Sequence, residues 1–259
     1  VAISSPDDDS TRLLQATDTA MYEAKKQPGL RVTYFDDQLR SRARRSHQIE
    51  TDLRQAIERE ELDVHYQPIV TIPEGACVGF ESLLRWNHPR LGRISPDDFI
   101  PIAEETGLIV PLGEWVLGQA LTQLRQWQML PGREALWVAV NLSCNQLNRV
   151  DIDSTVAAAL AESGVDPATV HLEITESVLM ERIDGSLETL NALRRLGVHL
   201  SVDDFGTGYS SLSYLKRLPV QTLKVDRTFT DGLGTDPHDT SIVRAISAMS
   251  EELGLELLA

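Results

Sequence analysis

The sequence lacks long apolar runs, has few cysteines and carries no excess of basic residues. No stretch approaches the roughly 18 consecutive apolar residues that a membrane-spanning helix needs, so we expect no membrane span here. The two cysteines, Cys77 and Cys144, lie far apart, which favours reduced thiols in a cytoplasmic protein. The net charge of −15 argues against binding to a nucleic-acid polymer, but it permits a small phosphate ligand held through divalent cations.

A targeting signal is also missing. The chain begins with Val1 and shows no charged start followed by an apolar segment and a cleavage site. We therefore expect a piece of a longer protein, whose preceding part could carry a membrane anchor.

From Leu62 onward, segments with strand patterns alternate with segments of helical periodicity. This alternation predicts an α/β fold with a mostly parallel sheet, either closed as a barrel or open. The predicted strands are Leu62–Val70, Ala76–Trp86, Leu136–Leu142, Val170–Thr175, His199–Asp203 and Thr222–Phe229. The predicted helices are one that starts at Ser95 and those at Leu112–Trp127, Ile152–Ser163, Ile183–Leu196 and Thr240–Leu253.

Two segments precede this alternation. Residues 1–35 predict a helix that Pro28-Gly29 ends, followed by a short strand. Residues 36–61 predict a linking helix, with Ile49, Leu53 and Ile57 at helical spacing. The linking helix also holds a small basic cluster, formed by Arg40, Arg42, Arg44 and Arg45. A solvated helix face explains the cluster, and contact with an anion or a partner is the alternative.

Five predicted strands share one pattern, in which polar residues oppose a bulky apolar face. In Val138–Asn141, for example, the valines share one face and Asn141 lies on the other. Strands of an open parallel sheet are usually apolar on both faces, whereas a barrel directs one face to its interior. The pattern therefore favours a TIM-like barrel with its site at the mouth. The polar residues expected to converge there are Glu81, Asn141, Glu173, Asp203 and Asp204, with Lys224 on the same side.

Four carboxylates and an amide in one place repel each other unless cations or protons neutralise them. Ligands that are all oxygen suit Mg²⁺ or Mn²⁺, and the adjacent Asp203 and Asp204 could bridge two such ions for attack on a phosphodiester. The alternative is that these acids are separate surface or buried-pair residues. The histidines lack paired ligand spacing, which argues against zinc, and Ser210-Ser211 lacks the context of a nucleophile.

These residues stand within motifs that resemble those of the EAL domain family from about Tyr66 to Ala259. The motifs include Tyr66-Gln-Pro-Ile69, Glu81-Ser-Leu-Leu-Arg-Trp86, Val140-Asn-Leu-Ser143, Leu172-Glu-Ile-Thr-Glu-Ser177, Ser201-Val-Asp-Asp-Phe-Gly-Thr-Gly-Tyr-Ser-Ser-Leu212 and Leu223-Lys-Val-Asp226. The resemblance implies a modified TIM-like (β/α) barrel whose first strand is antiparallel to its neighbours. It also implies hydrolysis of cyclic di-GMP to linear pGpG with two ions, Mg²⁺ or Mn²⁺.

The resemblance also implies a role for each matching residue. The metal ligands are Glu81, Asn141, Glu173, Asp203 and Asp204. Lys224 matches a lysine near the attacking water, and Glu176 matches a glutamate that holds the loop after Asp204 and couples the site to homodimerisation. Gln67, Leu83 and Arg85 match positions that contact the nucleotide.

The chain departs from the family pattern at two places. The motif that names the family has Ser82 in place of alanine; its side chain is expected to face away from the interior, with little effect. The chain also ends before a catalytic Glu-Gly-Val-Glu motif and the final strand, so we expect residues 62–259 to be an EAL domain without its C-terminal part.

A second resemblance concerns residues 1–35, where Ala20–Lys26 and Val32–Phe35 are similar to the C-terminal end of a GGDEF domain, the diguanylate cyclase module. The GGDEF signature itself is not in this chain, so no cyclase activity is assigned. The leading hypothesis is a cyclic di-GMP phosphodiesterase. Its rivals are an EAL-like receptor that binds cyclic di-GMP without cleaving it, and a purely structural or dimerising partner.

Overall fold

The structure, a computed structural model, describes residues 36–181, 183–207 and 215–259, together with isolated positions before residue 36. Its strands are β1 (Leu62–Val70), β2 (Cys77–His88), β3 (Gly92–Ile94), β4 (Trp137–Asn141), β5 (Val170–Thr175), β6 (His199–Phe205), β7 (Thr222–Val225) and β8 (Glu256–Leu258). The helices are α2 (Asp37–Leu53), α3 (Pro96–Thr106), α4 (Ile109–Gln128), α5 (Cys144–Leu147), α6 (Ile152–Ser163), α7 (Glu176–Glu181), α8 (Ile183–Arg195), α10 (Arg227–Thr230) and α11 (Pro237–Leu253).

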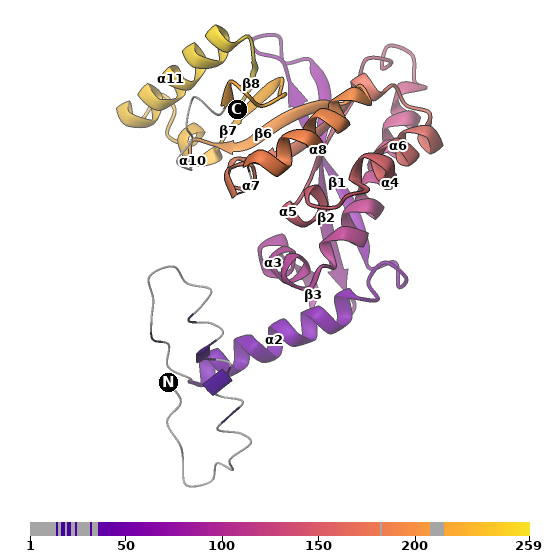
Figure 1. Cartoon of the computed structure of the whole chain (residues 1–259), viewed down its shortest axis with the longest axis vertical. Helices are drawn as coiled ribbons and strands as arrows, with labels where there is room; N and C mark the ends of the chain where they lie inside the picture. The colour runs from indigo at the N-terminus through magenta and orange to yellow at the C-terminus, as the bar shows by residue number, and fades with distance from the viewer. Residues whose placement is uncertain are drawn as a thin grey trace.

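The strands form one curled sheet in the order β1-β2-β4-β5-β6-β7-β8, and β3 pairs with β2 beside this path (Figure 1). β1 is antiparallel to β2, whereas each later pair along the path is parallel. The mixed α/β architecture with an antiparallel first strand confirms the fold class predicted from the sequence. The described strands make a curled half-barrel, in which β1 and β8 are the two edges.

The main hydrophobic core lies between the sheet and the helices that cover its outer face. Val138, Leu172 and Leu200 of the central strands are fully buried, and they pack in one cluster with Leu121 of α4 and Leu190 of α8. The alternation seen in the sequence therefore has a physical cause, because one face of each strand is removed from water by helices while the other faces the interior.

A second, smaller core lies at the far end of β2, under α2 and α3 at the lower end of Figure 1. Ile49 and Leu53 of α2 are each 2% exposed, and they pack in this core with Trp86 and Phe99. A helix is present within residues 36–61, but it ends at Leu53, so Ile57 of the predicted spacing lies in the turn that follows. Leu39, Ile49 and Leu53 are buried, whereas most of the other described side chains of α2 are exposed, which fits the solvated helix face that the charge pattern suggested. That this helix links two domains stays a prediction.

Several elements differ from the sequence prediction by one to three residues at their ends, and the largest difference is at β7. The strand predicted at Thr222–Phe229 is wrong in its last four residues, because it ends at Val225 and α10 follows. The Asp226 side chain accepts a hydrogen bond from the Thr228 backbone N–H at 2.8 Å and so starts this helix. The short strands β3 and β8 were not predicted. The helix and strand predicted in residues 1–35 lie outside the described residues.

None of the helices in the described part of the chain combines the length and apolar character that a bilayer crossing requires.

Candidate active site

The strand register brings the predicted polar residues to one face of the sheet. Asn141 pairs with Glu173 across β4 and β5, and Thr175 pairs with Asp203 across β5 and β6. Cross-strand partners point to the same side, so the alternation within each strand becomes a continuous inner face. Gln67 of β1 lies directly opposite Glu81 of β2 and extends this face to the sheet edge.

Four charged side chains meet on this face and form what we call the mouth cluster: Glu81, Glu173, Asp203 and Lys224. The Lys224 Nζ lies 2.7 Å from Glu81 Oε2, 2.9 Å from Glu173 Oε2 and 3.4 Å from Asp203 Oδ2. The Asn141 Nδ2 donates to Glu81 Oε1 at 3.0 Å, which places the amide at the border of the cluster. The polar residues that alternation along separate strands placed on one face therefore lie together in one compact cluster.

Burial and mutual repulsion shape the acidity of the cluster. Burial first, and then the neighbouring charges of Glu81 and Asp203, raise the pKa of Glu173 to about 7 against the opposing charge of Lys224. Burial likewise raises the pKa of Asp203. For Lys224, burial alone would lower the pKa, but the charges of Glu173, Asp203 and Glu81 outweigh it and raise the pKa above its usual value. Lys224 is therefore held as a cation.

Asp204 reaches the same cavity although strict alternation would turn it to the opposite face. The register of β6 against β7 shifts between Val202 and Phe205, and Asp204 has a left-handed backbone with φ of 54°. Aspartate tolerates this conformation better than most residues, so the bulge redirects its side chain. Partial desolvation, the adjacent Asp203 and a hydrogen bond with Asp226 raise the pKa of Asp204 to about 6.

Asp226 was missed as a site residue by the sequence analysis. Its carboxyl is hydrogen-bonded to that of Asp204 and lines the same cavity. The available signal was its spacing, because Asp226 follows Lys224 by two residues, directly after the end of β7.

A cavity of about 600 Å³ opens over the mouth cluster. Gln67 and Leu83, expected to contact a nucleotide, line it beside Glu81, Asp204 and Lys224. Arg85, the third expected nucleotide contact, lines a neighbouring cavity of about 290 Å³ instead. Leu83 borders both cavities, so the two hollows adjoin along β2.

Glu176 lies directly after β5, at the first position of α7, and is 1% exposed. Its Oε2 accepts a hydrogen bond from the Gly206 backbone N–H at 2.8 Å, whereas its Oε1 is buried without a hydrogen-bond partner in the described structure. Glu176 therefore holds the segment that follows Asp204, where the sequence analysis expected it. Residues 208–214 of that loop lie outside the description.

The donor set fits a divalent cation. One oxygen from each of Glu81, Glu173 and Asp203 can be chosen so that all lie within 4.8 Å of one another. Carboxylate oxygens are the ligands that Mg²⁺ and Mn²⁺ prefer, and the contact with Lys224 already shows that this site stabilises positive charge.

Below the mouth cluster, towards the N-terminal ends of the strands, the same inner face is aromatic. We call Trp137, His171 and His199 the floor stack. The rings of Trp137 and His171 are 4.0 Å apart and nearly parallel, and those of His171 and His199 follow at 4.6 Å. Burial and the neighbouring His199 lower the pKa of His171 to about 4, so its ring is neutral at neutral pH.

Comparison with known proteins connects this geometry to a family. A sequence model described as the EAL domain matches residues 50–259. The protein named bifunctional diguanylate cyclase/cyclic di-GMP phosphodiesterase MucR, from Pseudomonas aeruginosa, is 46% identical over 257 residues, which are 98% of this chain and 37% of that protein. The cyclic di-GMP phosphodiesterase NbdA of the same organism is 42% identical over 95% of this chain and 31% of its own length. The chain thus spans about a third of the length of these curated relatives.

Solved structures agree with this assignment. The structure titled PaMucR phosphodiesterase, c-di-GMP complex, has a TM-score of 0.77 and 48% identity, and the match covers 81% of this chain and 85% of that one. The EAL enzyme Bd1971 in its cAMP-bound form has a TM-score of 0.78 and 30% identity, over 97% of this chain and 65% of that one. With its motifs, its sheet and its mouth cluster in place, this chain belongs to the EAL domain family.

Proposed function

We propose that this protein hydrolyses cyclic di-GMP to linear pGpG with the help of divalent cations. The observation that carries the proposal is the mouth cluster, in which three carboxylates and one lysine from four strands meet under a cavity of about 600 Å³. The names of the relatives MucR and NbdA support the same substrate. The overall reaction adds water to one phosphodiester: the water oxygen bonds to phosphorus, the P–O3′ bond breaks, and the 3′ oxygen leaves with a proton.

We assign the cation ligands to Glu81, Asn141, Glu173, Asp203 and Asp204, and two ions, Mg²⁺ or Mn²⁺, suit this oxygen set. When bound, such ions supply positive charge against the phosphodiester oxygens and acidify a water molecule. Asp226 lies beside Asp204, and the proton that the two carboxyl groups share would have to leave for Asp204 to bind a cation as a carboxylate.

Lys224 has an electrostatic role in this proposal. Its ammonium group is held charged by three carboxylates, so it cannot serve as the general base in this arrangement. It can donate hydrogen bonds to a water molecule or to a phosphate oxygen that gains negative charge during attack. Gln67 and Leu83 would then contact the nucleotide within the main cavity, and Arg85 would contact it from the adjoining one.

The remaining expectations stay proposals. Residues 1–35 would be the end of a GGDEF-like domain and residues 36–61 its connection to the EAL domain; the name of MucR, which joins a diguanylate cyclase and a cyclic di-GMP phosphodiesterase in one protein, supports such a pairing. Homodimerisation would use the loop after Asp204, which begins next to the Gly206 contact of Glu176. A cytoplasmic location would fit Cys77 and Cys144, which form no disulfide.

The direct test is incubation of the purified protein with cyclic di-GMP and Mn²⁺ or Mg²⁺, with chromatography for pGpG. We expect turnover that ends when a chelator is added and that Glu81→Ala abolishes. Glu162→Ala, which removes an exposed carboxylate on α6, is the matched control and should turn over normally. Tight binding without product would instead identify a receptor, and turnover that survives Glu81→Ala would contradict the assigned site.

A further inference from the structure

Strand β2 extends beyond the part of the sheet in which it pairs with β4. Its pairing with β4 covers Gly79–Ser82, so this support ends next to Glu81. The following residues, Leu83–His88, pair with β1 on one side and with β3 at their end. We call Leu83–His88 the arm; in Figure 1 it runs from the curled sheet towards α2 and α3.

The arm has a site face and a core face. Leu83 and Arg85 lie on the face that borders the two cavities. Trp86, on the reverse face, is fully buried in the second core, where its ring lies 5.6 Å from that of Phe99 in an edge-on contact. Neighbouring residues of the arm therefore serve two purposes, because Trp86 anchors the strand from which Arg85 projects.

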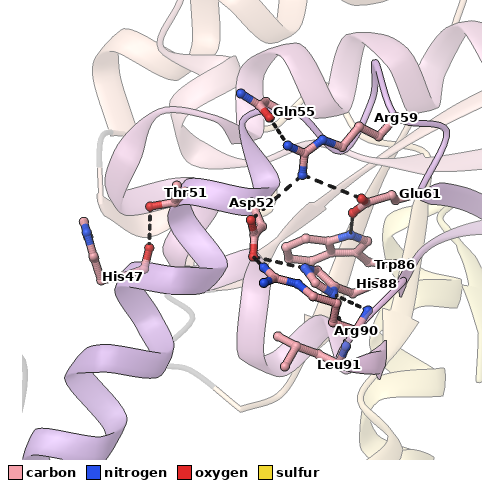
Figure 2. Close-up of polar contacts among 10 residues, drawn as sticks. All are labelled: His47, Thr51, Asp52, Gln55, Arg59, Glu61, Trp86, His88, Arg90 and Leu91. Carbon is pink, nitrogen blue, oxygen red and sulfur yellow. Dashed lines mark hydrogen bonds and ion pairs between the residues drawn. The ribbon is translucent and has the colours of Figure 1, made fainter.

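A polar network joins the arm to α2 and to the turn that follows α2 (Figure 2). His88 Nε2 lies 3.0 Å from Asp52 Oδ2, and the His88 side chain is 1% exposed. The His88 Nδ1 accepts hydrogen bonds from the backbone N–H groups of Arg90 and Leu91, both at 3.1 Å. Since Nδ1 is an acceptor, Nε2 carries the hydrogen and donates it to Asp52.

The same network has further contacts on both sides. The Arg90 guanidinium lies 3.4 Å from Asp52 Oδ2, and Trp86 Nε1 donates to Glu61 Oε2 at 2.9 Å. Arg59 lies between the two acids, 4.0 Å from Asp52 and 3.9 Å from Glu61. The carboxylates of Asp52 and Glu61 thus hold two residues of the arm, Trp86 and His88, to the segment that contains α2.

We propose that Asp52 and His88 are positioning residues for nucleotide binding, because through the arm they make the placement of Leu83 and Arg85 depend on how α2 is seated. This inference rests on the proposed function, in which Leu83 and Arg85 contact cyclic di-GMP. The assigned ligands Glu173 and Asp203 lie on β5 and β6, away from this network in the strand order. Glu81 lies on β2 just before the arm, but its pairing with Ala139 of β4 holds it independently of α2. Loosening α2 therefore affects substrate affinity more than the chemical step.

The length of α2 connects Asp52 to residues far from the polar network. Its 17 residues span about 25 Å. The end that carries Asp52 and the buried Leu53 is continuous with a first half that lies before residue 50, outside the region matched by the family model. A helix transmits displacement as a rigid rod, so a change at the start of α2 is carried to Asp52. Nucleotide affinity thereby becomes sensitive to the chain segment that precedes the EAL domain.

The test compares Asp52→Ala with Asp52→Asn in the purified protein. Alanine leaves the buried His88 N–H without its acceptor, whereas asparagine retains an oxygen for it. We expect Asp52→Ala to raise KM for cyclic di-GMP about tenfold while kcat changes less than about twofold, and Asp52→Asn to recover most of the affinity. Glu58→Ala, an exposed carboxylate near the end of α2 outside the network, should behave as the unmodified protein.

Two further measurements separate positioning from general destabilisation. Hydrogen exchange of peptides that cover residues 83–88 should become faster in Asp52→Ala and stay unchanged in Glu58→Ala. Val156→Ala, which removes buried methyl groups from the main core at α6, should lower the free energy of unfolding without raising KM. Unchanged exchange in the arm, or faster exchange with an unchanged KM, overturns the inference. A protein with no turnover at all overturns the proposed function instead, and the exchange data still decide whether α2 holds the arm.

Discussion

The inner face of the sheet has two regions that share the same strands and differ in their chemistry. Glu173 of the mouth cluster and His171 of the floor stack are two residues apart on β5, and both are largely buried. Burial raises the pKa of the first and lowers the pKa of the second, so desolvation opposes charge in both. In the mouth cluster Lys224 compensates this cost. In the floor stack the cost is avoided because the His171 ring is neutral. The comparison therefore separates a region that keeps its charges through an ion-pair partner from a region whose buried histidine is kept neutral, and it predicts that the first serves function and the second stability.

The largest effect is expected from Glu173→Gln, which removes a charge from the mouth cluster without changing its size. The kcat/KM for cyclic di-GMP should fall at least about 100-fold, because an assigned cation ligand is lost. The melting temperature at pH 8 should stay the same or rise, since the raised pKa of Glu173 means that folding disfavours its charge. Glu162→Gln on the surface of α6 is the control for both assays. A large loss of stability in Glu173→Gln would contradict the division of roles.

The floor stack should respond to pH in a defined direction. Its His171 has a pKa of about 4 when folded and 6.5 as a free group, so between these values the unfolded chain binds a proton that the folded protein excludes. Stability contributed by a neutral His171 is therefore lost as the pH falls from 6.5 to 4, by roughly 3 kcal/mol. Urea unfolding in the presence of a chelator measures this contribution as the difference between the unmodified protein and His171→Phe, because the raised pKa values of Glu173 and Asp204 give both proteins a slope of opposite sign. Trp137→Phe, which alters the stack without removing a titrating group, should keep the pH dependence of the unmodified protein.

A smaller change is expected where β2 meets the floor stack. A Cβ added at Gly79 would lie 2.4 Å from Cδ2 of the Trp137 ring, so Gly79→Ala must displace the stack. We expect the free energy of unfolding to fall by about 1–3 kcal/mol. Gly118→Ala is the matched control, because a Cβ there meets nothing within 4 Å and α4 should gain up to about 1 kcal/mol. Equal stability of the two variants would show that the Trp137 ring can move without lowering the free energy of unfolding.

The smallest effect is expected on the reverse face of β2. Ser82, which stands next to Glu81, is buried and donates a hydrogen bond from its hydroxyl to the Ala139 carbonyl at 2.7 Å. Ser82→Ala should lower stability by about 1 kcal/mol or less and leave kcat and KM within about twofold. A strong loss of activity would mean that this bond between β2 and β4 also fixes the mouth cluster.

Sequence reasoning found the mouth cluster because alternation along a strand is a local property. Glu81, Asn141, Glu173 and Lys224 each oppose apolar neighbours that are one residue away, and the sheet then brings them together. Asp204 was included on the strength of its neighbour, and its actual route to the cavity is a bulge with a left-handed residue. The spacing of apolar residues does not predict such a bulge.

Other features depend on contacts between segments far apart in the sequence. The floor stack needs the register of three strands, which places the ring of Trp137 against that of His171. The anchoring of α2 needs Asp52 to meet His88, 36 residues later, through a hydrogen bond whose partner no spacing rule selects. The end of β7 was misjudged because Asp226 acts as a helix cap, which competes with an apolar pattern that continues to Phe229.

The three ion pairs of Lys224 have a consequence for how this acidic site assembles. The chain supplies its own counter-ion, so its carboxylates can gather while the protein folds without waiting for a metal. Any divalent cation that later binds these oxygens competes with an ammonium group already in contact with them. The apparent affinity of the site for metal therefore includes the free energy needed to move the Lys224 side chain. A change in that free energy alters the metal concentration at which the site fills.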